Sequence, residues 1–159
     1  MRRRRFGLGV ISDTHGLLRP EAVDALRGSD MIVHAGDIGS PEVLRGLETI
    51  APVVAVRGNN DREPWAKGLP LSDSFELGRA SIYVLHDVNE LDLDPRVAGF
   101  SVVIAGHSHQ PRSEERNGVL FFNPGSAGPR RFRLPISVGR IVIEGARVRG
   151  LLETLEITA

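Results

Sequence analysis

The histidines of this sequence lie in or beside short polar clusters whose side chains are typical metal ligands. There are five histidines, and polar residues capable of binding metal or moving protons accompany each one. The clusters are Asp13-Thr14-His15, His34 with Gly36-Asp37, Gly58-Asn59-Asn60-Asp61, His86-Asp87 and Gly106-His107-Ser108-His109. Imidazole nitrogens and carboxylate oxygens bind divalent transition-metal ions. Together the clusters predict a metal site with mixed nitrogen and oxygen ligands.

The number and spacing of these ligands point to more than one ion. Asp13 and His15 are two residues apart, as are His107 and His109, so each pair points to one side if strand geometry persists. One four-coordinate ion needs fewer ligands than the clusters offer, so we expect two ions that share a bridging carboxylate. These two pairs, together with an Asp and an Asn from the other clusters, make a mixed set of nitrogen and oxygen ligands. Glycines at positions 36, 58 and 106 allow close backbone approach or a positive φ.

Buried strands are expected immediately before the clusters. Short apolar runs bounded by turn residues are typical of strands covered on both faces. These runs are residues 9–11, 31–33, 53–56, 82–85 and 102–105. In an open α/β sheet, ligands bind outside the carboxyl ends of the strands, so the clusters should meet at one edge.

Helices alternate with the early strands, and the end of the chain is rich in strands. One helix is predicted from the cap Ser40 and Pro41 to Ile50, and another over residues 20–28. Alternating patterns over 135–143 and 146–157, with a turn at Glu144-Gly145 and a further run at 119–122, predict antiparallel strands. Residues 64–71 read as an irregular loop in which Trp65 packs. We therefore expect an α/β fold with a parallel first part.

Composition fits one ordinary domain spanning 1–159. The chain has 159 residues, 41% apolar and 25% charged, with 20 Lys plus Arg, 20 Asp plus Glu and no cysteine. The absence of cysteine excludes disulfide scaffolds, thiol nucleophiles and cysteine metal sites. Zero net charge argues against nucleic acid as a partner, and Arg2 to Arg5 read as a solvated terminus. With no apolar run long enough for a membrane span or signal peptide, a cytoplasmic protein is expected. An edge strand of the tail could pair two copies into a homo-oligomer.

The ordered set of clusters resembles the five signature blocks of the calcineurin-like metallophosphoesterases. With Ser12-Asp13-Thr14-His15-Gly16 and Asn123-Pro124-Gly125-Ser126, the sequence is most similar to the small bacterial and archaeal phosphodiesterase branch. The resemblance implies a four-layer αββα sandwich of two mixed β-sheets flanked by helices. It also implies a metal-dependent phosphoesterase, in which a hydroxide bridging two metal ions attacks a small phosphate ester without a covalent intermediate.

The same resemblance implies a role for each site residue. One ion would be held by Asp13, His15 and His109, the other by Asn59, His86 and His107, and Asp37 would bridge them. Asp37, Asn59 and His107 would also position the hydroxide or contact phosphate, and Arg62 would bind a substrate phosphate oxygen. Two divalent ions are implied, manganese first, with iron, zinc, nickel, cobalt and magnesium also compatible. His34 would orient a neighbouring ligand or simply pack, and Asn123 and Ser126 would fix a turn.

Two positions depart from the family pattern. Asn60 stands where many relatives have a histidine thought to protonate the leaving group, and an amide is no proton donor near neutral pH. Asp87 stands where a glycine is expected after the histidine of the fourth block. The source of the leaving-group proton and the geometry around His86 are therefore open at this point.

Three other functions compete with phosphodiester hydrolysis. The ligands could hold metal in a non-catalytic scaffold for protein–protein interaction, although all seven ligand positions are filled. A phosphomonoesterase or a nuclease of the same fold would use the same ligands. A compact chain without an insertion large enough to build a cap indicates an open site with room for a second ester group, which favours the diesterase.

Overall fold

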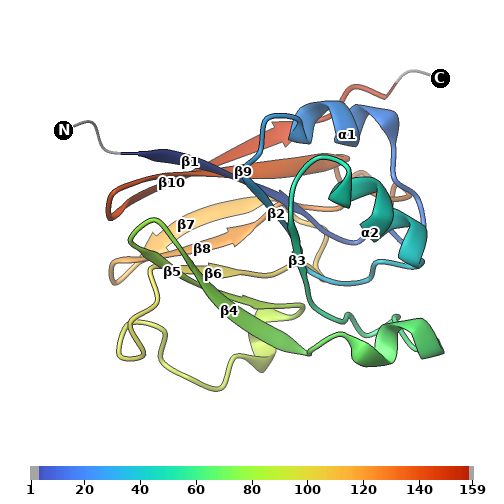
Figure 1. Ribbon diagram of the computed structural model, residues 1–159. Helices are drawn as coiled ribbons and strands as arrows, with labels where there is room; N and C mark the ends of the chain where they lie inside the picture. Colours follow the sequence, from blue (N-terminus) through green and yellow to red (C-terminus); the bar gives the residue numbers. More distant parts are fainter. Residues whose placement is uncertain (1–3, 158–159) are drawn as a thin grey trace.

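Two five-stranded sheets pack face to face in the computed structural model, which describes residues 4–157 (Figure 1). The first sheet has the order β10-β9-β1-β2-β3 and the second β4-β5-β6-β8-β7. The strands of the first sheet are β1 (Arg5–Ile11), β2 (Met31–His34), β3 (Val53–Ala55), β9 (Ser137–Glu144) and β10 (Arg147–Thr154). Those of the second are β4 (Ser72–Leu77), β5 (Ala80–Leu85), β6 (Val102–Ile104), β7 (Arg112–Arg116) and β8 (Val119–Asn123).

Each sheet combines a parallel part with antiparallel edge strands. Strands β1, β2 and β3 are parallel, and the hairpin of β9 and β10 joins β1 in antiparallel pairing. In the second sheet β5, β6 and β8 are parallel, with β4 and β7 antiparallel at the edges. The two mixed sheets expected from the family resemblance are confirmed. The 119–122 run lies in the parallel part of the second sheet rather than with the antiparallel tail.

The space between the sheets is filled by the apolar faces of both. Alternate residues of β5 are buried, and Ile82 and Val84 pack with Val10 and Val33 of the first sheet. Burying such side chains stabilises the fold by roughly 1.5–3 kcal/mol each relative to leaving them exposed. Because the strands are fixed by this packing, the loops that follow their carboxyl ends leave from rigid supports.

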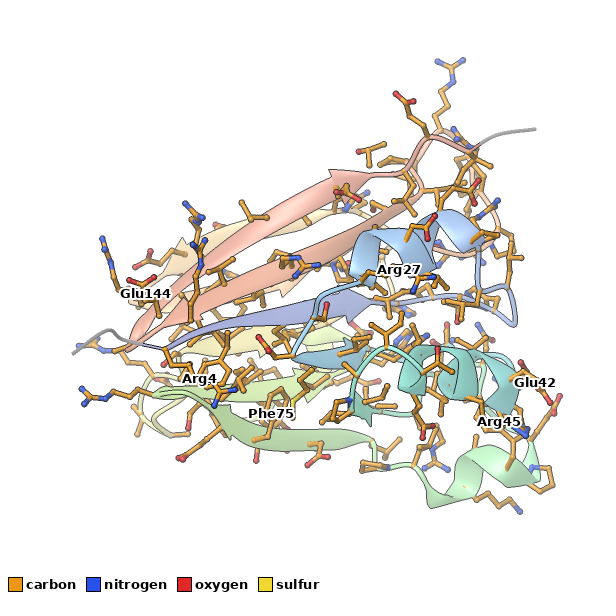
Figure 2. The ribbon with its side chains drawn as sticks, turned by 45° about the horizontal axis from the view of Figure 1, so that its top comes forward. Arg4, Arg27, Glu42, Arg45, Phe75 and Glu144 are labelled. Carbon is orange, nitrogen blue, oxygen red and sulfur yellow. The ribbon has the colours of Figure 1, made fainter. Side chains whose placement is uncertain are left out.

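Two α-helices cover the outer face of the first sheet (Figure 1). Helix α1 (Pro20–Leu26) and helix α2 (Pro41–Glu48) begin at the predicted prolines, and α2 ends two residues before the predicted end. Val43 and Leu47 of α2 are buried against this face, whereas Glu42 and Arg45 point outward and form a 3.1 Å ion pair (Figure 2). The periodicity of apolar residues therefore identified the buried face of α2 correctly.

The outer layer of the second sheet is thinner than the four-layer description implies. Among residues 4–157 no α-helix lies there; the short 3-10 helix η2 (Val88–Glu90) leads into irregular chain up to residue 100. Leu91 from this segment packs against a small cluster that includes Leu85 and Val103. A second 3-10 helix, η1 (Pro64–Gly68), occupies part of the predicted loop at 64–71. Within residues 4–157, no helix is long and apolar enough to cross a membrane.

Candidate metal centre

The predicted ligands sit on tight loops rather than on strand extensions. Strand β1 ends at Ile11, and Asp13 and His15 have φ values of 55° and 48°. Asp37, His107 and His109 also have positive φ, at 57°, 70° and 62°. The premise that strand geometry persists through these pairs was therefore wrong. Non-glycine residues seldom adopt this region, and such strain persists where the surrounding structure imposes it, often at functional sites.

The loops nevertheless bring the carboxylates and imidazoles together. Oδ1 of Asp13 lies 3.4 Å from Nε2 of His109 and 3.8 Å from Nε2 of His86. Oδ2 of Asp37 lies 3.3 Å from Nε2 of His86 and 3.9 Å from Nε2 of His15. Possible ligand atoms lie within 4.8 Å of one another in two groups. The groups are Asp13, His15 and His109, and Asp13, Asp37 and His86.

Asn59 and His107 form the more open side of the same centre. Nδ1 of His107 is 3.2 Å from Oδ1 of Asn59, and the His107 backbone N–H donates to Oδ2 of Asp13 at 3.0 Å. The His107 side chain is 44% exposed, whereas that of His109 is 4% exposed. The structure thus brings together all seven residues predicted as ligands, with His107 facing solvent.

Four buried polar atoms of this centre have no hydrogen-bond partner. They are Oδ1 of Asp13, Nε2 of His15, Nε2 of His86 and Nδ1 of His109. Buried polar groups are nearly always paired, because an unpaired one costs about 1–3 kcal/mol. Divalent cations would satisfy the first three of these atoms, and the nitrogen and oxygen donor set fits such ions. At His109 it is Nε2, 3.4 Å from Oδ1 of Asp13, that faces the centre. The residues present therefore fit the metals that the sequence predicts.

Neighbouring groups set the tautomer of His86. Its Nδ1 lies 2.7 Å from the carbonyl of Ala35, which can only accept, so Nδ1 carries the proton and Nε2 faces the carboxylates. Burial lowers the pKa of His86, but the nearby Asp37 carboxylate, 3.3 Å from Nε2, and the charge of Asp13 outweigh it and raise the pKa to about 9. Without metal the ring is therefore protonated near neutral pH; a bound cation would take the place of the Nε2 proton, while Nδ1 keeps its proton on the Ala35 carbonyl.

The two central carboxyl groups are held in their charged form. Burial raises the pKa of Asp13, yet the His109 ring, the Ser12 hydroxyl and the charge of His86 bring it below its ordinary value. The pKa of Asp37 is likewise lowered, because the contact with His86 and the backbone N–H of Asn60 outweigh burial. Both groups are thus carboxylates, the form that binds cations.

Asn60 orients Asp37. Its backbone N–H donates to Oδ1 of Asp37 at 2.9 Å, and its side-chain amide donates to Oδ2 at 3.1 Å. Asn60, which stands where many relatives have a histidine, thus donates two hydrogen bonds to the carboxylate that is predicted to bridge the ions. This contact depends on tertiary structure and was not predicted from the sequence.

His34 connects the loop of Asp13 and His15 with the loop of Asp37. It is fully buried, and its Nδ1 accepts from the backbone N–H of Gly36 at 3.1 Å. Nε2 must then carry the proton, and it donates to Oγ1 of Thr14 at 2.9 Å, whose hydroxyl donates to the carbonyl of Ile38. Burial lowers the pKa of His34 to about 4, so the ring stays neutral in this network.

Asp61 fastens the loop of Asn59 to the loop of Asp37. Its side chain is almost completely buried and accepts hydrogen bonds from the backbone N–H groups of Ile38, Gly39 and Gly58 at 3.0 to 3.1 Å. Sequence reasoning placed Asp61 in a motif but gave it no role of its own. The available signal was an acidic residue directly after the predicted ligand loop.

Glycine is required where two loops come closest. Gly36 has φ +103°, and a Cβ there would meet Nδ1 of His86 and the backbone of Gly58. A Cβ at Gly106 would collide with the Ser12 hydroxyl and the Asp13 carboxylate. The sequence predicted that the backbone comes close to a neighbouring group at these glycines. In the structure that neighbour is another loop of the site.

The remaining predicted residues lie around the centre. Nε of Arg62 donates to the Asn59 carbonyl at 3.1 Å at an exposed position. Nδ2 of Asn123 donates to the Gly106 carbonyl at 2.9 Å, and Oγ of Ser126 donates to the Asp13 carbonyl at 3.1 Å, so both fix loops as expected. Oδ2 of Asp87 lies 3.7 Å from Nε2 of His107, while Oδ1 accepts from the backbone of Asn89.

Comparison with known proteins places this centre in a family. The sequence model of the calcineurin-like phosphoesterase superfamily domain matches residues 6–146. The chain belongs to the calcineurin-like phosphoesterase superfamily. This phosphoesterase is 39% identical over 153 residues to a protein of Methanothermobacter thermautotrophicus named "Probable metallophosphoesterase". The match covers 89% of this chain and 88% of that relative. The chain is therefore a hydrolase of the phosphoesterase type.

Solved structures share the architecture of this phosphoesterase. One, titled as a novel archaeal phosphodiesterase, aligns with a TM-score of 0.76 at 26% identity and covers 92% of this chain and 99% of its own. Vacuolar Protein Sorting 29 from Cryptosporidium parvum also aligns with a TM-score of 0.76, at 20% identity, covering 94% of this chain and 97% of its own. The second likeness shows the fold alone.

Proposed function

We propose that this phosphoesterase hydrolyses phosphodiesters with the help of two divalent cations. The observation that carries the proposal is that three buried atoms without hydrogen-bond partners, Oδ1 of Asp13 and Nε2 of His15 and of His86, lie together at the two central carboxylates. A structural polar core would pair these atoms with each other or with backbone groups. Cation binding explains why they are kept unpaired.

The ligand assignment takes one ion from the first group of side chains and the other from His86 with the two residues of the open side. Asp13, His15 and His109 would hold one ion, and Asn59, His86 and His107 the other. Asp37 would bridge, since its Oδ2 lies within 4 Å of both the His15 and the His86 ring. Manganese is our first expectation among divalent metals that accept imidazole and carboxylate ligands.

The protein side chains orient the reacting groups. When bound, two cations would supply Lewis-acid activation of a water molecule and would neutralise charge on the phosphoryl oxygens. Asn60 holds Asp37 in one orientation through two hydrogen bonds, and the Ala35 carbonyl fixes the His86 ring. His107 and Asn59, on the open side, would contact the phosphoryl group.

The leaving group receives no proton from position 60. The Asn60 amide donates to Asp37 and carries no titratable proton near neutral pH. We therefore expect the leaving alcohol to depart as an anion or to take its proton from water. Esters with good leaving groups should consequently be hydrolysed much faster than esters with poor ones.

A preference for diesters rests on the exposure of the site. The His107 side chain is 44% exposed, and the helices and strands of residues 4–157 form no separate capping domain. A solved structure similar to this chain is also titled as a phosphodiesterase. A second ester group can thus extend from the phosphorus beyond the centre.

The test compares bis-p-nitrophenyl phosphate with p-nitrophenyl phosphate as substrates. Protein stripped of metal and then reloaded with manganese should hydrolyse the diester faster than the monoester. The Asp37→Asn variant should lose turnover, and the exposed Asp73→Asn variant, matched in chemistry, should keep it. No turnover with metal demonstrably bound would contradict the proposal and favour a non-catalytic metal-binding scaffold. A faster monoester reaction would contradict the diester preference alone.

A further inference from the structure

A cavity of about 250 Å³ lies beside the metal centre on the outer face of the second sheet. His107 belongs to both: its Nδ1 faces Asn59 in the centre, and its side chain lines the cavity with Asp87. A phosphate ester bound at the centre could therefore extend past His107 into this space. The cavity is not used by the proposed chemistry.

The floor of the cavity is apolar and partly aromatic. It is lined by Val103 of β6, by Ala105 just after this strand, and by Phe121 of β8. The guanidinium of Arg116 lies over the Phe121 ring, 4.2 Å from its centroid. An apolar floor beside a planar guanidinium suits a flat aromatic group.

Charges at the rim are balanced. Arg112 forms a 2.6 Å ion pair with Glu114, and Arg116 lies 3.9 Å from the same carboxylate. Asp87 supplies a second carboxylate next to His107. Two guanidinium groups and the Asp87 carboxylate line the cavity, and Glu114, which lies outside the lining, neutralises Arg112, so the rim carries little net charge. An uncharged occupant fits best.

The size of the cavity matches part of a substrate. Pockets that enclose a whole drug-sized ligand measure about 300–1,000 Å³. A volume of about 250 Å³ is below this range and suits one ring system attached to a phosphoryl group held elsewhere.

We infer that this cavity binds an uncharged aromatic group of the phosphate ester and so determines substrate specificity. The inference rests on the proposed function, since the phosphoryl group is held at the metal centre. Val103, Ala105 and Phe121 form the binding surface, and His107 marks its boundary with the centre.

Binding of two phosphonates tests the inference without turnover. Benzylphosphonate places a ring one atom from phosphorus, as in a phenyl ester, and ethylphosphonate lacks the ring. Titration calorimetry on the manganese-loaded protein should show benzylphosphonate binding about tenfold or more tightly than ethylphosphonate. The Ala105→Leu variant, which fills the floor, should weaken benzylphosphonate about tenfold and change ethylphosphonate less than about twofold.

Two further variants make the result unambiguous. Ala98→Leu, the same change at an exposed position outside the cavity, should bind both phosphonates like the original protein. If Ala105→Leu fails to fold, Phe121→Leu replaces it in the test. This variant keeps an apolar side chain but removes the ring, so it should weaken the binding of benzylphosphonate selectively.

The outcomes separate this inference from the proposed function. Metal-dependent binding of both phosphonates with equal affinity would overturn the inference and leave the metal centre intact. Equal weakening of both by Ala105→Leu would also overturn it, because the effect would then lie at the centre. If neither phosphonate binds the loaded protein, the proposed function fails and the inference fails with it.

Discussion

Asp61→Asn should destabilise the protein even though the change replaces a carboxylate by an amide of nearly equal size. The Asp61 carboxylate is buried and accepts from the backbone N–H groups of Gly58, Ile38 and Gly39. An amide has only one accepting oxygen, and its NH₂ group would face at least one of these N–H donors.

The size of the effect follows from these contacts. Each hydrogen bond to a charged group contributes about 1.5–3 kcal/mol, and a buried donor left without a partner costs about 1–3 kcal/mol. Loss of one such bond, with weakening of the others, should lower the free energy of unfolding by about 2–4 kcal/mol. Because Asp61 joins the loops of Asp37 and Asn59, metal affinity should also fall, by about tenfold or more.

Urea denaturation of the metal-free protein measures the first effect, and competition with a chelator measures the second. Asp92→Asn, the same change at an exposed position, should leave both unchanged. A loss of less than about 0.5 kcal/mol would refute the reasoning, because that is the range of ordinary surface substitutions.

Three further results are expected. His34 has a pKa of about 4 in the folded protein against 6.5 ordinarily, so its contribution to stability is present above about pH 6.5 and is lost as pH falls toward 4. The free energy of unfolding should fall by about 3 kcal/mol over this range. Urea denaturation at both pH values should show a smaller fall in His34→Gln. Asn60→Ala removes the amide contact with Asp37, so a chelator competition should show metal affinity reduced by about tenfold, and an unchanged affinity would argue against this orienting role. Rates for a series of aryl and alkyl diesters should fall steeply as the leaving-group pKa rises, and a flat dependence would show that another residue supplies the proton.

The buried strands could be predicted from the sequence, but the polar edge strands could not. Runs such as Val102 to Ile104 are apolar on both faces, which is typical of central strands. Strands β4 and β7, with sequences SDSFEL and RSEER, are largely exposed at the sheet edges. Their conformation is set by antiparallel pairing with β5 and β8, a nonlocal interaction that local pattern does not reveal.

The site was predictable in its residue types and less so in its geometry. Strand ends carrying His, Asp and Asn identified the seven residues that the structure brings together. The positive φ values of Asp13 and His107, in contrast, arise from packing between loops far apart in sequence. The contacts of Asn60 and Asp61 with the Asp37 loop span more than twenty residues, so their supporting roles emerge only from the tertiary structure.

The number of bound metal ions per chain tests the central claim most directly. Metal-free protein equilibrated with manganese and freed of excess ion should contain two ions per chain by elemental analysis, and Asp37→Asn should contain fewer. A single ion per chain, or none, in the original protein would contradict a centre built by these seven side chains for two cations.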